Sequence, residues 1–216
     1  MVKCFLISSQ LSYFLSLVGN DKYVFFMWCA YILCAPPFYL TPVSFLTFPI
    51  FVILLDAINT IQNFKKRLLI SALTCGNFGF GYFVYSLWWA SNALLIDPIT
   101  YAWTIPFVIF GLPIYLALYW FFAGFIIGWL WTKGIARFLF AFALGLAEWL
   151  RAILFTGFPW NALGYTAMPT PMFMQSDMIV GLYGMNILSV LVYSLPTVLL
   201  TNEKRNLLLF FVFYLY

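Results

Sequence analysis

Long apolar stretches, separated by short groups of Pro, Gly, Asn and charged residues, follow one another along nearly the whole sequence. A bilayer core about 30 Å thick needs roughly 20 apolar residues for each helical span. The stretches predict spans near 23–40, 43–62, 68–90, 104–131, 135–154 and 178–200, and a further one that begins at residue 206. The expected fold is therefore all-α, a polytopic transmembrane helix bundle of six to seven spans.

The composition excludes a large water-soluble domain. Hydrophobic residues make up 65% of the 216 residues and charged residues only 7%, whereas about 25% of a soluble domain is charged. The net charge of +4 comes from brief clusters in the connections and not from one basic face with interleaved aromatic residues. Nucleic acid is therefore not an expected partner.

Histidine is absent from the sequence. Its absence removes Ser-His-Asp catalysis, His-based metal sites and His proton relays together. The four cysteines, Cys4, Cys29, Cys34 and Cys75, lie in apolar runs and form no Cys-x-x-Cys pair. We interpret them as buried small hydrophobic residues, so that neither a metal site nor a cofactor is expected.

The basic residues predict the orientation in the membrane, because loops rich in Lys and Arg stay in the cytoplasm. With the first span near residue 23, nine of the ten basic residues fall on one side, and only Arg151 lies near an outer end. The opposite connections, near 36–42, 92–103 and 155–176, contain no Lys or Arg. The N-terminus is therefore expected in the cytoplasm.

The two ends of the chain differ from the predicted bundle of residues 23–205. Residues 1–22 are interpreted as a cytoplasmic or interfacial segment; within them, 4–18 could also be a signal peptide or an extra span, although no small-residue cleavage pattern follows. Residues 206–216 are apolar but reach only about 16 Å as a helix. They are expected to be the start of a truncated further span, or a short helix against the bundle.

Glu148 and Arg151 are three residues apart on one predicted helix, within reach of each other. Each charge alone near a helix centre would cost roughly 2.5 to 3.5 kcal/mol. Two interpretations remain open: a structural ion pair near the outer interface, or a pair that shapes a polar pocket where the helix meets the following loop.

That loop, residues 155–165, combines Gly157, Pro159 and Gly164 with aromatic residues. Gly and Pro predict a turned, non-helical backbone, which at membrane depth must be covered by protein or line a cavity. The aromatic residues could belong to the interfacial belt. Together with the charged pair they could instead form a pocket for a lipid chain or headgroup. These aromatic residues are Phe158, Trp160 and Tyr165.

Two further patterns occur inside predicted spans. Asp56 is interpreted as a snorkelling or helix-pairing carboxylate near Lys65 to Arg67, with a proton site as the alternative. Gly124 and Gly128, in a Gly-x-x-x-Gly pattern, predict close packing of two helices.

Several of these residues together resemble a known family. The segment Glu148-Trp-Leu-Arg151, followed by Phe155-Thr-Gly-Phe-Pro-Trp-Asn-Ala-Leu-Gly-Tyr165, resembles the signature of bacterial apolipoprotein N-acyltransferases, and 181–186 is similar to their next membrane segment. The similarity runs from about residue 20 to the end. It implies a multi-pass protein of the bacterial inner membrane, which transfers an acyl chain from a phospholipid to the amino-terminal cysteine of a diacylated lipoprotein.

In that family a periplasmic nitrilase-like domain supplies a Glu, Lys and Cys, and none of these three has a counterpart in this sequence. We therefore assign no catalytic residue here and expect the chain to be inactive alone. Phe158, Pro159, Trp160 and Tyr165 are expected to line substrate, with Glu148 and Arg151 holding the loop. Expected partners are a membrane phospholipid, a diacylated lipoprotein and, in a split enzyme, a separately encoded nitrilase-like half; the alternative is a non-catalytic membrane fragment.

Overall fold

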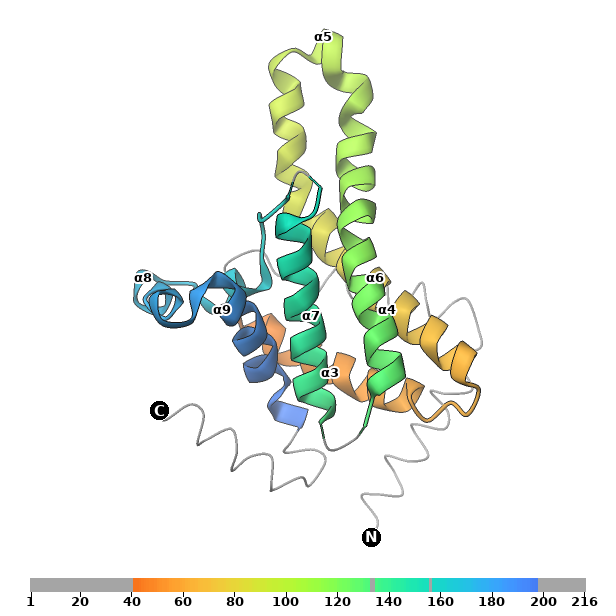
Figure 1. Ribbon diagram of the computed structural model, residues 1–216. Helices are drawn as coiled ribbons and strands as arrows, with labels where there is room; N and C mark the ends of the chain where they lie inside the picture. Colours follow the sequence, from red (N-terminus) through yellow and green to blue (C-terminus); the bar gives the residue numbers. More distant parts are fainter. Residues whose placement is uncertain (1–40, 133–134, 156, 198–216) are drawn as a thin grey trace.

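The structure is a computed structural model that describes residues 41–132, 135–155 and 157–197. Every regular element in this part of the chain is helical, which confirms the all-α prediction for it (Figure 1). The five long helices are α3 (Thr41–Ile58), α4 (Phe64–Leu87), α6 (Leu112–Leu130), α7 (Ala136–Ile153) and α9 (Asp177–Ser194). The shorter elements are η1 (Trp88–Ile96), α5 (Pro98–Tyr101), η2 (Ala102–Thr104), η3 (Phe107–Gly111), η4 (Leu163–Ala167) and α8 (Pro171–Met174).

Three helical segments of the described chain are long and apolar enough to cross a membrane: Phe64–Ile96, Phe107–Leu130 and Asp177–Ser194. In α3 the apolar part, Thr47–Ile58, is shorter. Helix α7 occupies the span expected at 135–154, but it carries three charged residues in its 18 positions and is not one of these three segments. The stretches 1–22, 23–40 and 206–216 lie outside the described residues. The count of six to seven spans is therefore not confirmed and stays a prediction.

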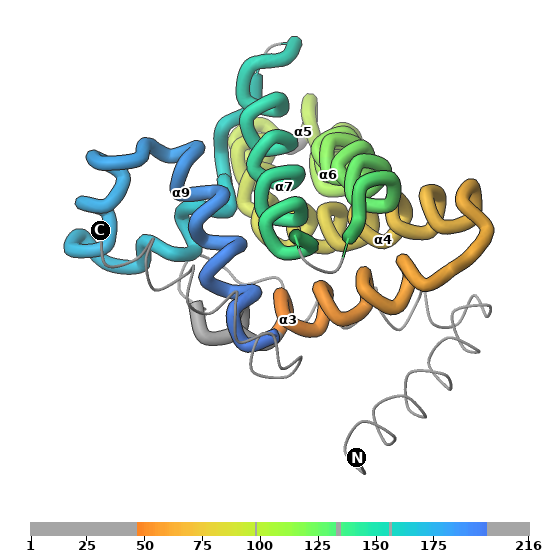
Figure 2. Tube along the Cα trace, turned by 60° about the horizontal axis from the view of Figure 1, so that its bottom comes forward, coloured from red at the N-terminus to blue at the C-terminus, as the bar shows by residue number. Residues whose placement is uncertain are grey.

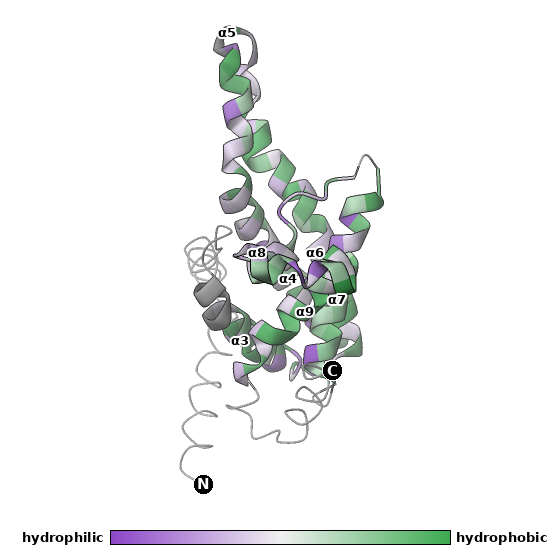
Figure 3. Ribbon diagram, turned by 90° about the vertical axis from the view of Figure 1, so that its left-hand side faces the viewer, coloured by the Kyte–Doolittle hydropathy of each residue, from purple (hydrophilic) through white to green (hydrophobic). Residues whose placement is uncertain are grey.

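Large apolar side chains cover the outside of the helices as well as the core. Ile50, Phe122, Trp129 and Phe142 are all more than half exposed. Figure 3 shows apolar residues along the whole length of the long helices, with hydrophilic ones scattered among them. A helix that is apolar on all sides is typical of a membrane protein, because lipid and not water surrounds its outer face.

An aromatic cluster joins three helices at the centre of the bundle. Phe51 of α3 stacks on Phe78 of α4 with a ring-centroid distance of 4.6 Å, and its ring lies 5.3 Å from that of Phe140 of α7. Phe48, one turn earlier on α3, meets Phe78 edge to face at 5.6 Å. Such pairs add about 0.5–1.5 kcal/mol to the burial of their area. The cluster therefore fixes α3 against α4 and α7.

Helices α4 and α6 approach each other through small residues, and α4 crosses α6 obliquely while α6 and α7 lie side by side (Figures 1 and 2). A Cβ atom added at Gly124 would lie 2.6 Å from both the Cα of Ala72 and the carbonyl oxygen of Ser71. At Gly128 it would lie 3.0 Å from the side chain of Ser71. The close packing predicted from the Gly-x-x-x-Gly pattern is confirmed.

Beyond this crossing, the two helices continue into a hairpin that projects past the end of α7, with α5 at its tip (Figure 1). The connection expected at residues 92–103 is not a plain loop: η1 extends α4 to Ile96, and α5 and η2 follow Asp97. The hairpin returns through a π-helical turn, η3. The predicted third span, 68–90, therefore ended too early, because apolar residues in 3₁₀ geometry continue the helix to Ile96.

At the opposite end of the bundle, polar contacts tie three helices together. The indole nitrogen of Trp131 donates to the Asp56 carboxylate at 2.8 Å, and Arg67 Nε donates to the carbonyl oxygen of Gly128 at 3.1 Å. Asp56 thus acts as a helix-pairing carboxylate between α3 and the end of α6. The contact of Arg67 also places the basic residues of 65–67 beside the end of α6.

We expect Gly124→Ala to lower the stability of the bundle by about 1–3 kcal/mol, the usual cost of overpacking. The added methyl group would meet backbone atoms of α4, so the two helices would have to separate. Thermal unfolding in detergent measures the loss. Gly111→Ala is the matched control, because no atom lies within 4 Å of its added Cβ; equal unfolding midpoints for both variants would contradict the packing argument.

Candidate functional site

The charged pair predicted on one helix forms a buried, two-pronged ion pair near the C-terminal end of α7. Glu148 and Arg151 are each only 1% exposed. Arg151 Nε donates to Glu148 Oε1 at 3.0 Å, and Nη2 donates to Oε2 at 2.6 Å. Fork-to-fork geometry of this kind makes the strongest carboxylate–guanidinium contacts. The pair is therefore a fixed element of the fold.

The remaining donors of Arg151 hold the loop that follows α7. Nη1 donates to the carbonyl oxygens of Phe158 at 2.5 Å and Trp160 at 2.9 Å, and Nη2 donates to that of Asn161 at 3.2 Å. A guanidinium has five N–H donors, so all five are engaged. Its plane also lies over the ring of Phe83, 5.0 Å from the centroid. One side chain thus fixes three carbonyl groups of a non-helical segment.

The acceptors of Glu148 are equally engaged. Oε1 also accepts from the indole nitrogen of Trp120 at 2.9 Å, and Oε2 accepts from the backbone N–H of Leu163 at 3.3 Å. With the two bonds from Arg151, the carboxylate has four donors around its roughly four lone-pair sites. A carboxylate satisfied in this way has no free lone pair for proton transfer, so its geometry supports positioning and not acid–base catalysis.

Asn161 is a second fixed point of the same loop. Its backbone has φ = +54°, a left-handed conformation that Asn tolerates better than most residues. Its side chain is buried and donates to the carbonyl oxygen of Ser86 at 2.6 Å, while its own carbonyl accepts from the hydroxyl of Tyr82 at 3.1 Å. The loop is thus attached to α4 as well as to α7.

The loop begins and ends with two further contacts. Gly157 has φ = +69°, and the next N–H, that of Phe158, donates to the carbonyl oxygen of Arg151 at 2.8 Å. Only glycine fits here, because an added Cβ atom would lie 2.4 Å from the carbonyl oxygen of Ala152. At the far end, the N–H of Gly164 donates to the side-chain oxygen of Asn186 at 2.6 Å. Helices α7 and α9 therefore hold the two ends.

The aromatic residues predicted to line substrate lie in different environments. Phe158 is half-buried and packs against the core. Trp160 is 60% exposed, with its ring centroid 6.0 Å from that of Trp89, and Pro159 is exposed. Tyr165 is half-buried in η4. Of these residues, the structure holds the backbone of Phe158 and Trp160 at Arg151, while the side chains point to different surroundings. Their contact with substrate stays a prediction.

Sequence reasoning missed several residues of this cluster: Phe83, Trp120, Asn161, Leu163 and Asn186. Two signals were available, since Asn161 is the one amide of the loop and Asn186 ends a segment of the family resemblance. No sequence signal marked Trp120, because it lies in an uninterrupted apolar run. No group of three or more His, Cys, Asp or Glu side chains that could hold a metal ion occurs among the described residues.

The fold and the site together define an all-helical membrane domain in which a buried ion pair holds a loop. The model of the family "Apolipoprotein N-acyltransferase N-terminal domain" matches residues 29–195. The chain is 47% identical over 170 residues to an apolipoprotein N-acyltransferase of Brucella melitensis, covering 77% of this chain and 32% of the relative. It is 45% identical over 177 residues to that of Rhizobium rhizogenes, covering 81% of this chain and 33% of the relative.

The chain therefore belongs to the family of amino-terminal domains of apolipoprotein N-acyltransferases. It spans about a third of the length of the curated relatives that it matches.

We expect Glu148→Gln to destabilise the domain by about 3–5 kcal/mol, because it leaves the buried Arg151 charge without a counter-charge. Hydrogen–deuterium exchange should also rise at Leu163, whose N–H donates to the carboxylate. Thermal unfolding and exchange mass spectrometry in detergent measure both effects. Asp97→Asn removes an exposed carboxylate and is the matched control; similar losses in the two variants would show that the pair does not hold the loop.

Proposed function

We propose that this chain is the membrane part of an enzyme that transfers an acyl chain from a phospholipid to the amino-terminal cysteine of a diacylated lipoprotein. The observation that carries the proposal is the match to the N-acyltransferase family, combined with a loop whose backbone is fixed at a helix end by a buried, fully engaged ion pair. The names of the relatives support the reaction class.

The reaction proceeds in two balanced steps. The thiolate of a catalytic cysteine attacks the ester carbonyl of the phospholipid, which forms a thioester and releases a lysophospholipid. The amine of the lipoprotein then attacks the thioester, forms an amide and returns the thiol. We propose that the residues that make and break these bonds lie in the nitrilase-like part of the enzyme and that residues 41–197 hold the lipid-accessible cleft.

The proposed location is the bacterial inner membrane, with the N-terminus in the cytoplasm and the loop 155–165 on the outer side. The distribution of basic residues supports this orientation, since nine of ten fall on one side of the predicted spans. The contact of Arg67 with Gly128 agrees with it, because it joins the basic start of α4 to the end of α6 that leads towards Lys133. Helix α7 then runs from this end to the loop.

A chimera tests the proposal. Residues 29–195 replace the matching part of the Brucella melitensis relative, and N-acylation of a diacylated lipopeptide is measured in the presence of phospholipid. We expect turnover from the chimera and none from the 216-residue chain alone. An inactive but folded chimera would contradict the proposal; turnover by the chain alone would show that it holds the bond-making residues itself.

Within the active chimera, we expect Trp160→Ala to lower turnover roughly tenfold, equivalent to about 1.4 kcal/mol of barrier. Trp160 is 60% exposed in the middle of the loop 155–165, and its removal should leave the ion pair and the bundle intact. Trp103→Ala is the control, because Trp103 is also largely exposed, at 71%, but lies on the projecting hairpin. Unchanged turnover in Trp160→Ala would remove this side chain from the substrate site.

A further inference from the structure

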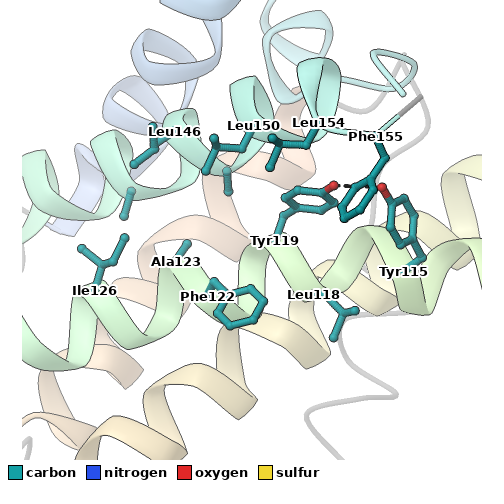
Figure 4. A pocket seen from close by; sticks show the side chains of 12 residues that line it. Tyr115, Leu118, Tyr119, Phe122, Ala123, Ile126, Leu146, Leu150, Leu154 and Phe155 are labelled. Atoms are coloured by element: carbon teal, nitrogen blue, oxygen red, sulfur yellow. Dashed lines mark hydrogen bonds between the residues drawn. The ribbon is translucent and has the colours of Figure 1, made fainter. Parts of the chain in front are cut away.

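An apolar groove of about 370 Å³ runs along the seam between α6 and α7 (Figure 4). Helix α6 contributes one stripe at helical spacing, and α7 contributes the facing stripe. The lining residues are Tyr115, Leu118, Tyr119, Phe122, Ala123, Ile126, Ala143, Leu146, Ala147, Leu150, Leu154 and Phe155. This groove is separate from the cluster around Arg151, which lies on other faces of the same helices.

The dimensions of the groove fit a single hydrocarbon chain. From Tyr115 to Ile126 the helix advances eleven residues, or about 16 Å, which is roughly half of the 30 Å hydrocarbon core and thus the depth of one leaflet. Its volume of about 370 Å³ lies near the lower end of the range of about 300–1,000 Å³ that small-ligand sites cover. A narrow apolar groove of this length and volume fits one unbranched chain.

The floor of the groove explains why it stays open. Ala123, Ala143 and Ala147 are buried beneath it, with at most 3% exposure. Larger side chains such as Phe122 and Leu146 form its walls. Small residues below and large ones at the sides leave a channel at the surface that only a thin apolar ligand fills.

The surface of the groove is almost wholly apolar, and the nearest polar atoms lie beside Phe155 at one end of it. The hydroxyls of Tyr115 and Tyr119 share a hydrogen bond of 2.9 Å (Figure 4). Each tyrosine hydroxyl has one hydrogen to donate, and this bond uses only one of the two. In the described part of the chain, the second hydrogen has no further protein acceptor. It can therefore donate to an ester or phosphate oxygen of a ligand.

We propose that this groove binds one acyl chain of an outer-leaflet phospholipid, with the glycerol ester or phosphate oxygens at the Tyr115–Tyr119 pair and the methyl end near Ile126. The role of this lipid as acyl donor rests on the proposed function. The end of the groove at Tyr115 lies where α7 ends, beside the loop 155–165, and the end at Ile126 lies about 16 Å further along α6. This order matches the polarity gradient of one leaflet.

The first residue of the loop 155–165 forms the rim of the groove at its Tyr115 end. Phe155 follows the last residues of α7 with φ = +54°, an unfavourable conformation for a bulky side chain. Its ring centroid lies 6.2 Å from that of Tyr115. Such a conformation persists where its surroundings determine it, and here the chain three residues later is held by Arg151. The ion pair therefore also positions the mouth of the groove.

Photocrosslinking of the full 216-residue chain in lipid nanodiscs tests the inference. Two phosphatidylglycerol probes carry a diazirine on one acyl chain, either beside the ester or at the methyl end. We expect the ester-side probe to label Tyr115, Leu154 and Phe155, and the methyl-end probe to label Phe122, Ile126 and Leu146. Even labelling of all lipid-facing side chains, or the reverse order along the groove, would overturn the proposal.

Variants separate specific binding from general lipid contact. Leu146→Trp should fill the groove and lower labelling at least fivefold, whereas Phe138→Trp, outside the groove on the same helix, should leave it unchanged. Tyr115→Phe should lower ester-side labelling about threefold to tenfold, as expected for one lost hydrogen bond. Equal labelling of the two tryptophan variants would contradict the assignment.

The readout is occupancy and not turnover, so the two proposals fail separately. An inactive chimera together with ordered lipid labelling would count against acyl transfer alone. An active chimera without ordered labelling would count against the groove alone.

Discussion

The loop after α7 depends on one interaction, the buried pair of Arg151 and Glu148. A non-helical segment leaves backbone groups without helical partners, and where such groups are buried no water replaces them. Arg151 supplies three of the missing donors, to the carbonyl oxygens of Phe158, Trp160 and Asn161, and Glu148 supplies an acceptor for the N–H of Leu163. The pair thus takes the place of solvent. Its charges compensate each other, so the loop gains strong hydrogen-bond partners without an uncompensated buried charge.

This arrangement connects the loop to a second feature of the same two helices. On α6, Tyr119 faces the groove while the adjacent Trp120 donates to Glu148. On α7, Leu150 faces the groove while the adjacent Arg151 holds the loop. The bond between Trp120 and Glu148 therefore fixes the spacing of the helices on one side and, with it, the width of the groove on the other. Any change at the pair should also alter the groove.

The sequence predicted the parts of the structure that depend on local spacing. The i,i+3 separation of Glu148 and Arg151, the helix-breaking residues after them and the Gly124–Gly128 pattern are each read from neighbouring positions. Partners far apart in sequence were not predictable, because Trp120 is one aromatic residue among many in an apolar run, and nothing local distinguishes it. The extension of α4 through η1 was missed for a related reason: with lipid or neighbouring helices able to cover apolar residues on any side, periodicity does not mark where such a helix ends.

Small residues have opposite effects on the two sides of α6, and this difference follows from what faces them. Gly124 meets backbone atoms of α4, so the missing side chain lets the two helices touch. Ala123 is its neighbour, but it faces the small residues Ala143 and Ala147 of α7 across the floor of the groove. Where a small residue meets a backbone, the gap closes; where small residues meet each other between larger walls, a channel remains. The order of sizes around one helix thus produces both the close α4–α6 crossing and the apolar groove between α6 and α7.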